Sequence, residues 1–301
     1  MVIKGNGAVN TMEAVKINTK EKERTKVTYH KSVFSSVLTG ITWGAAILAL
    51  AVLVFLVGFI LIRGVKNLTL EQFAWTYNTE NVTMLPAIIN TVTMTVLSLL
   101  LAAPLGIFSA IYLVEYANKR GKLVGLIRIT AETLSGIPSI VYGLFGMLFF
   151  TKTLKMGYSM MSGACTLAIM ILPLIMRTAE EALKSVPDSY REASFGLGAG
   201  KLRTIFKIVL PSAVPGILSG VILATGRVVG ETAALIYTAG TVAQVPKNVL
   251  GSGRTLAIHM YMLSSEGLYM NQAYATAVIL LVLVVAINTL SGVAAKKLTK
   301  A

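Results

Sequence analysis

Two charged residues, Arg227 and Glu231, lie inside a long apolar stretch of the chain. A spacing of four residues places both on one face if the stretch is helical. A guanidinium presents a planar fork that can bond two oxygens of an oxyanion at once, so Arg227 predicts positive charge on an anion path, with Glu231 holding it in position. The alternative interpretation is a buried ion pair that cancels its own charge while the helices pack.

Two further arginines, Arg177 and Arg128, also lie at or near apolar runs. Arg177 ends another apolar run and is a second candidate for the anion path, with an interfacial anchor as its alternative role. Arg128 and Glu132 also lie four apart, and for them we favour an interfacial helix pair without a role in binding.

A polar segment at about 178–211 separates two of the apolar runs. Within it, Ser189-x-x-Glu192 matches a capping box with Pro187 just upstream, which predicts a short helix that stops at the glycine-rich run 196–200. A short amphipathic helix held between two membrane helices is suited to dock a partner and to transmit a push.

Sites for ATP and metals are not supported by the sequence. The run Gly198-Ala-Gly200-Lys201-Leu202 is close to a phosphate-binding loop, but Leu202 replaces the required Ser or Thr. His30 and His259 stand alone, without a cluster of metal-binding residues around them. We therefore expect no ATPase site, no metal and no cofactor in this chain, and no enzyme activity of its own.

Long charge-free runs must position these residues. The chain has 301 residues, of which 55% are hydrophobic and 13% are charged, against about 25% charged in soluble domains. This composition excludes a water-soluble enzyme and a free nucleic-acid-binding protein. Runs of about 20 apolar residues cross a bilayer, and lipid requires them to be helical. We predict an all-α membrane protein with six transmembrane helices at 39–62, 85–114, 129–150, 160–177, 212–239 and 273–295.

The distribution of basic residues orients these helices. If both termini are cytoplasmic, 20 of the 27 Lys and Arg residues face the cytoplasm, six are external and Arg227 lies within a span. Basic residues concentrate on the cytoplasmic side, so we predict cytoplasmic N- and C-termini in a cell membrane. We expect residues 1–36 to form a flexible basic arm that meets anionic lipid rather than nucleic acid, and residues 37–301 to form the membrane domain.

Glycine and proline mark expected features of the spans. The pairs Gly216/Gly220 and Gly226/Gly230 are spaced to allow close approach of neighbouring helices. Kinks are expected at Pro104, Pro138 and Pro173.

The polar segment resembles the coupling loop of permease subunits of ABC importers. The matching residues are Glu192-Ala193-Ser194, then Gly198 and Ile208-x-Leu210-Pro211, with Ser194 in place of the usual alanine. Three further runs are similar to PstA-type phosphate permeases: Glu132 to Gly146, Leu172 to Leu183, and Gly226 to Ala233. The sister permease type, PstC, shares the Gly-Arg-x-x-Gly-Glu-Thr theme, and the continuation to Gly240 favours PstA.

The resemblance implies a MetI-like fold that forms half of a translocation path for phosphate. It also implies coupling of ATP hydrolysis through the loop at 178–211, with Ser189, Glu192, Ala193 and Gly198 as the candidate coupling residues. The implied partners are a PstC-like permease, two ATP-binding subunits and an external phosphate-binding protein. The alternatives are the PstC-like sister subunit, a permease for molybdate or sulfate, a secondary transporter that uses Arg227 and Glu231 as a proton relay, and a membrane scaffold or sensor.

Overall fold

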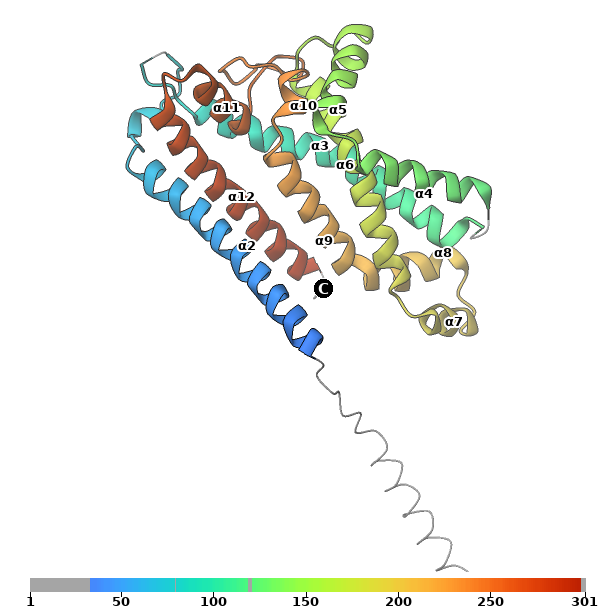
Figure 1. The fold of residues 1–301 in the computed structure, drawn as a ribbon. Helices are drawn as coiled ribbons and strands as arrows, with labels where there is room; N and C mark the ends of the chain where they lie inside the picture. The colour runs from blue at the N-terminus through green and yellow to red at the C-terminus, as the bar shows by residue number, and fades with distance from the viewer. Residues whose placement is uncertain (1–32, 79, 119–120, 299–301) are drawn as a thin grey trace, which may run out of the picture. The chain divides into compact units, whose positions relative to one another are not determined.

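The computed structural model describes residues 33–78, 80–118 and 121–298, and every regular element in these ranges is helical (Figure 1). The longer helices are α2 (Val33–Val65), α3 (Leu85–Ile111), α4 (Lys122–Ser135), α5 (Ser139–Gly146), α6 (Met160–Lys184), α7 (Asp188–Gly196), α9 (Leu210–Val229), α11 (Leu256–Glu266) and α12 (Met270–Leu298). The short elements are α8 (Lys201–Thr204), α10 (Ala233–Ile236), a 3-10 helix (Leu70–Phe73) and π-helical segments at Tyr112–Tyr116, Met147–Thr153 and Ile205–Val209. The prediction of an all-α protein is confirmed.

The chain forms two units that divide after Val57. The described part of the first unit is a single apolar helix, the first part of α2. The helix begins at Val33, so residues 33–36, which were expected in the N-terminal arm, are helical. The remainder of that arm, residues 1–32, lies outside the described residues. The second unit holds all the other helices and the candidate sites.

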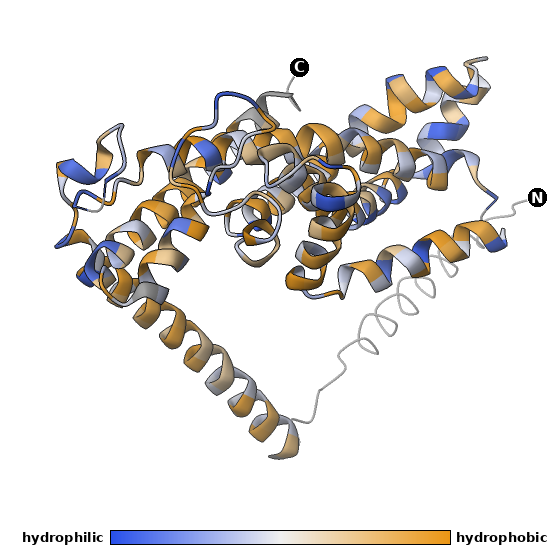
Figure 2. Cartoon of the chain, turned by 90° about the horizontal axis from the view of Figure 1, so that it is seen from above, coloured by the Kyte–Doolittle hydropathy of each residue, from blue (hydrophilic) through white to orange (hydrophobic). Residues whose placement is uncertain are grey.

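The apolar helices agree with the number of predicted spans. Five helical stretches are long and apolar enough to cross a membrane, and a bent pair of helices makes a sixth if the pair is one span. The long helices are mostly hydrophobic along their length (Figure 2). The five stretches are 34–65, 85–116, 160–184, 201–229 and 270–293, and the bent pair covers 122–135 and 139–153.

The third predicted span is not a continuous helix. The prediction of one helix over 129–150 is wrong, because α4 and α5 meet at an angle of 102°. Gly136 caps α4, and Pro138 precedes α5 with an extended ψ of 141°. Proline has no N–H to continue the helical ladder and disfavours helical geometry in the residue before it, so the chain turns here.

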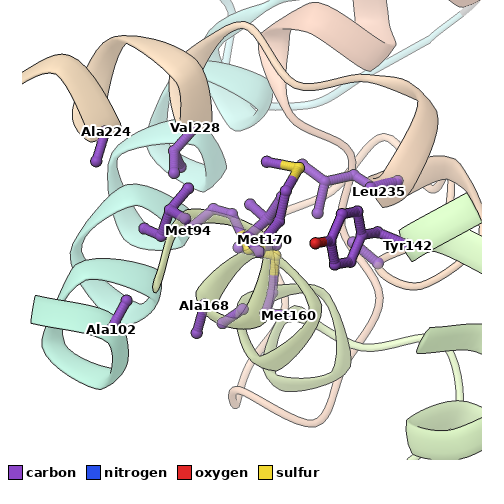
Figure 3. Close-up of a cluster of buried hydrophobic side chains, with 14 of the residues drawn as sticks. Met94, Ala102, Tyr142, Met160, Ala168, Met170, Ala224, Val228 and Leu235 are labelled. Carbon is purple, nitrogen blue, oxygen red and sulfur yellow. The ribbon is translucent and has the colours of Figure 1, made fainter. Parts of the chain in front are cut away.

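The core of the second unit lies where α3, α6 and α9 pack together, with α5 and α10 beside them. Its buried side chains include Met94 of α3, Met170 of α6 and Val228 of α9 (Figure 3). A Cβ at Gly216 would lie 2.6 Å from the Cβ of Ala182, and one at Gly220 would overlap Thr178. The first glycine pair therefore lets α9 approach α6 closely, as the spacing predicts.

The second glycine pair does not have this function. A Cβ at Gly226 would make ordinary contact with Asn288 at 3.7 Å, and one at Gly230 would lie 3.8 Å from the nearest backbone oxygen. Gly230 instead ends α9 as its C-cap. The prediction of one continuous span over 212–239 is consequently wrong: the helix stops at Val229, and the short α10 follows after a break.

Residues 256–266 form a helix that the charge pattern does not predict. The first backbone N–H of α11, that of Leu256, donates a hydrogen bond to the hydroxyl of Thr91 on α3 at 2.8 Å. A buried side chain far away in the sequence thus satisfies one of the donors that a helix N-terminus leaves open.

Candidate functional site

The polar segment forms the predicted short helix, α7, at Asp188–Gly196, although its cap differs from the prediction. Pro187 is the N-cap residue and no side chain caps the helix, so the predicted capping box between Ser189 and Glu192 is wrong. Asp188 provides the acidic residue of the first turn, which suits the positive end of the helix dipole. The side chains of Ser189 and Glu192 are exposed.

Gly198 ends α7 through its backbone conformation. Its φ is +79°, in the left-handed region that favours glycine. The N–H of Gly198 donates to the carbonyl of Phe195 at 2.9 Å, and that of Ala199 donates to the carbonyl of Ser194 at 3.1 Å. This pair of bonds is a Schellman motif, which closes the helix and turns the chain toward α8.

Ser194, the departure from the usual alanine, forms a buried contact between the two arms of the loop. Its hydroxyl lies 2.9 Å from the hydroxyl of Thr204 at the end of α8, and both side chains are buried. A buried hydroxyl pair is stabilising when both groups are bonded to each other. The substitution therefore joins α7 to α8 in this chain.

Arg191 ties α7 to the rest of the second unit, a role that sequence reasoning missed. Its guanidinium donates five hydrogen bonds, to Glu115, Asp188 and the carbonyls of Leu183 and Val186. The ion pair with Glu115 measures 2.8 Å and is mostly buried. The available signal was Glu115 itself, a carboxylate at the end of an apolar run.

The helices α7 and α8, the loop between them and the π-helical segment Ile205–Val209 line a pocket of about 500 Å³. Apolar side chains share it with two basic ones. A pocket lined by apolar and basic side chains can accept a protein surface that carries apolar and acidic groups. The lining residues include Ala193 and Gly198, two of the candidate coupling residues, together with Tyr190, Leu197, Arg203 and Lys207.

Arg177 lies in the exposed part of α6, within a network of charges. It pairs with Glu181 at 3.2 Å, and both side chains are exposed, so the pair contributes little to stability. Next to it, the buried Glu180 accepts from Arg128 and from Lys184, each at 2.7 Å. The expected pair between Arg128 and Glu132 is therefore wrong.

Arg227 and Glu231 do not form the pair expected from their spacing. Since α9 ends at Val229, Glu231 lies beyond the helix, and its carboxylate accepts the N–H of Ala234 at the start of α10 at 3.1 Å. No ion pair of Arg227 is found among the residues that the structure describes. A self-cancelling pair and a proton relay both lose their geometric basis.

The exposed side chain of Arg227 faces a pocket of about 640 Å³ between α6, α9 and α12. The other residues that line this pocket are uncharged: Leu174, Ser219, Ile222, Leu223, Gly226 and Asn288. Arg177 lines a different pocket, with Arg128, Lys184 and three glutamates. Within this chain, the two candidate arginines of the anion path thus lie in separate pockets.

Metal binding finds no support in the described part of the chain. No group of three or more His, Cys, Asp or Glu residues there could hold a metal ion. His30 lies outside the described residues.

Comparisons with known proteins agree with the helical architecture. Residues 102–300 match the family described as the binding-protein-dependent transport system inner membrane component. The probable ABC transporter permease protein YqgI of Bacillus subtilis (strain 168) is 33% identical over 255 residues, which cover 79% of this chain and 86% of YqgI.

Two further relatives cover more of the chain. The phosphate transport system permease protein PstA 1 of Mycobacterium tuberculosis (strain CDC 1551 / Oshkosh) is 33% identical over 274 residues, covering 87% of this chain and 88% of that protein. The phosphate transport system permease protein PstA of Mycobacterium leprae (strain TN) is 31% identical over 272 residues, with the same coverage of 87% and 88%.

Solved transporter structures share the fold. A chain of the bacterial alginate ABC transporter, in complex with an alginate pentasaccharide-bound periplasmic protein, superposes with a TM-score of 0.62 at 15% identity, over 89% of this chain and 95% of its own. A chain of the inward-facing MetNI methionine ABC transporter superposes with a TM-score of 0.54 at 19% identity, over 80% and 96%. At these identities the likeness establishes the fold alone.

Proposed function

Because the chain belongs to the family of binding-protein-dependent transport system inner membrane components, multi-pass permeases of ABC importers with the MetI-like fold, we propose that it is a PstA-type permease of an ATP-driven phosphate importer. The observation that carries the choice of phosphate is the match to phosphate transport permeases over 87% of this chain. The helical break after Val229 and the pocket of Arg227 belong to this matched region.

Arg227 supplies positive charge to the anion path. It is exposed in the last turn of α9, in a pocket whose other lining residues carry no charge. A guanidinium in such surroundings needs an anion, and its planar fork fits two oxygens of phosphate. Glu231 acts by anchoring α10, and so shapes the chain that follows Arg227.

Arg177, in α6, contributes to the anion path on the side that the charge distribution assigns to the cytoplasm. Its exposed pair with Glu181 is weak and can open for a passing anion. The two arginines lie in separate pockets of one chain, so a PstC-like second permease completes the route between them.

The coupling loop transmits the push of the ATP-binding subunits. Ser189, Glu192, Ala193 and Gly198 lie on or next to α7. In the assembled importer, one of the two ATP-binding subunits contacts α7 of this chain, and the other contacts the second permease. The Arg191–Glu115 pair and the Ser194–Thr204 contact connect α7 to the segment after α3 and to α8. Movement of α7 is thereby passed to the helices that enclose the path.

The assembled importer contains this chain, a PstC-like permease, two ATP-binding subunits and an external phosphate-binding protein in a lipid bilayer. Both termini face the cytoplasm. ATP is hydrolysed in the partner subunits, and this chain carries no cofactor and no ATPase site of its own.

The substrate is tested with the complete importer in proteoliposomes. ATPase activity and uptake of radioactive phosphate are measured with binding protein loaded with phosphate, sulfate or molybdate. We expect stimulation with phosphate alone; stimulation by another oxyanion and not by phosphate contradicts the substrate. The Arg227→Gln variant is expected to lower the uptake of phosphate about 10- to 100-fold, which corresponds to the loss of a charged hydrogen bond. The matched control, Arg63→Gln, is expected to leave uptake unchanged.

Coupling is tested in the same vesicles. Glu192→Gln and Gly198→Ala are expected to lower the uptake of phosphate per ATP hydrolysed, with Glu71→Gln, an exposed glutamate outside both arginine pockets, as a control. A membrane scaffold or sensor would tolerate all three changes. Unchanged transport in the first two variants would argue against coupling through α7.

A further inference from the structure

Arg254 is a buried arginine without a counter-charge among the residues that the structure describes. The residue is 6% exposed, and its Nε and Nη2 atoms have no hydrogen-bond partner in the described part of the chain. No carboxylate of the described residues forms an ion pair with it. A buried charge is costly unless it is paired and hydrogen-bonded, so this arrangement calls for a ligand.

The backbone around Arg254 is held firmly on α3. The N–H of Arg254 donates to the carbonyl of Val242 at 2.9 Å. The buried amide of Asn90 donates to the carbonyls of both Gln244 and Arg254, at 2.8 and 3.1 Å. The side chain therefore starts from a fixed position, which lowers the entropy that ligand binding would cost.

Aromatic rings hold the guanidinium from one side. Its central carbon lies 4.7 Å from the centre of the Tyr77 ring, a favourable cation–π distance. The ring of His259 meets Tyr77 edge to face at 6.5 Å. Burial, together with the charge of Arg254, lowers the pKa of His259 to about 3, so this histidine is neutral near pH 7 and Arg254 carries the positive charge.

The same arginine lines a pocket of about 650 Å³. No acidic side chain belongs to its wall, and several polar side chains do. The pocket lies in the segments before α3 and before α11, on the side that the charge distribution predicts to be external. Its polar members are Thr76, Tyr77, Thr241, Gln244 and Arg254, and Trp75 and Pro86 belong to its apolar part.

We infer that Arg254 forms the base of an oxyanion-binding subsite, filled either by free phosphate or by a carboxylate of a docked protein. Nε and Nη2 form the edge of the guanidinium that binds two oxygens side by side, and these are the two atoms left without partners. Both are covered in the structure, so the occupant reaches them by a small displacement of the pocket wall. The choice of phosphate rests on the proposed function, whereas the oxyanion chemistry does not.

The experiment uses the complete importer in nanodiscs, and the fluorescence of Trp75 is taken as the difference between each importer and the same importer carrying Trp75→Phe. Phosphate is titrated first without the binding protein, while the fluorescence of Trp75 and the binding of radioactive phosphate are measured. The phosphate-loaded binding protein is then titrated, and ATPase activity is measured. The variants are Arg254→Gln, Arg254→Lys, which keeps the charge and loses the fork, and the matched control Arg63→Gln, an exposed arginine over the ring of Phe59.

Free phosphate as occupant predicts a saturable Trp75 response that Arg254→Gln weakens at least tenfold, that Arg254→Lys weakens less, and that Arg63→Gln leaves unchanged. A protein carboxylate predicts no response to free phosphate, but at least a tenfold higher concentration of binding protein for half-maximal ATPase activity in Arg254→Gln. Equal behaviour of Arg254→Gln and Arg63→Gln in both titrations overturns the subsite.

A second variant guards against misfolding of Arg254→Gln. Ala243→Phe fills the pocket and leaves Arg254 in place, and it is expected to give the same loss. Normal titrations in Ala243→Phe would also overturn the inference. The proposed function fails by a separate result, the absence of ATPase stimulation by phosphate-loaded binding protein in the wild-type importer.

Discussion

Arg191 and Arg254 are two mostly buried arginines with opposite surroundings. Arg191, on α7, donates five hydrogen bonds and pairs with the buried Glu115. Arg254, just before α11, has no ion pair among the described residues and leaves two donors unpaired. The helices α7 and α11 lie at opposite ends of the second unit (Figure 1). A buried charge with all its bonds made holds a structure together, whereas one with bonds missing is placed to receive a ligand.

The largest effect is expected from Arg191→Met. This change leaves the carboxylate of Glu115 buried without its partner, which costs about 3–5 kcal/mol of folding free energy. Denaturant unfolding in detergent micelles measures the loss, and Arg203→Gln, an exposed arginine on α8, is the control. Adding Glu115→Leu to Arg191→Met is expected to recover most of the stability; no recovery would show that Arg191 acts through its backbone contacts.

The stability of the folded protein is expected to depend on pH through His259, which lies near Arg254. His259 lies in α11, outside the candidate membrane spans, and its pKa of about 3 is below the ordinary value of about 6.5. Between pH 6.5 and pH 3, the unfolded chain therefore binds a proton at His259 that the folded chain does not. The contribution of His259 to the free energy of unfolding is complete above pH 6.5 and is lost as the pH falls toward 3. From well above pH 6.5 down to pH 5, the loss is about 2 kcal/mol.

Thermal unfolding in detergent, measured at several pH values, tests this dependence. His259→Gln is the control, because it removes the titrating group and is expected to flatten the profile over this range. The same slope in both proteins would assign the pH dependence to other groups.

Arg254→Met is expected to change the free energy of unfolding in the opposite direction from Arg191→Met. Removing an unpaired buried charge and replacing it with an apolar side chain of similar length is expected to stabilise the protein without ligand by about 1 kcal/mol, after the lost cation–π contact with Tyr77 is subtracted. The midpoint of denaturant unfolding measures the change. A loss of several kcal/mol would place Arg254 in the same structural class as Arg191.

The smallest effect is expected at the end of α7. Gly198→Ala forces an alanine into a φ of +79°, at a cost of about 1 kcal/mol. Gly200→Ala is the matched control, because Gly200 has an extended conformation with open space around its Cα. Equal stabilities in thermal unfolding would mean that the loop adjusts its turn without strain.

The sequence predicted the features that depend on composition and on local spacing. Apolar length indicates the six membrane-crossing segments, and the polar segment with its glycine-rich end indicates α7. The local signals for the bend between α4 and α5, Gly136 and Pro138, were present as well. The kink predicted at Pro138 is confirmed, but its size of 102° could not be predicted, because the angle depends on what the two helices pack against.

The partners of the charged residues could not be predicted. Regular helical spacing suggests Arg128 with Glu132 and Arg227 with Glu231, yet Arg128 bonds Glu180, which lies 52 residues away. Likewise, Arg191 bonds Glu115 across 76 residues. Such pairs depend on how α3, α4, α6 and α7 come together, which no local pattern contains.

The sequence by itself determined that this protein crosses a membrane in helices, since apolar runs with unsatisfied backbone groups have no other stable form in lipid. It also determined the family, through motifs whose matches span most of the chain. The tertiary structure alone decided which arginines are paired. Helix ends and interhelical contacts set the distance between charges, and that distance separates the structural Arg191 from Arg227 and Arg254, which form no ion pair with the residues that the structure describes.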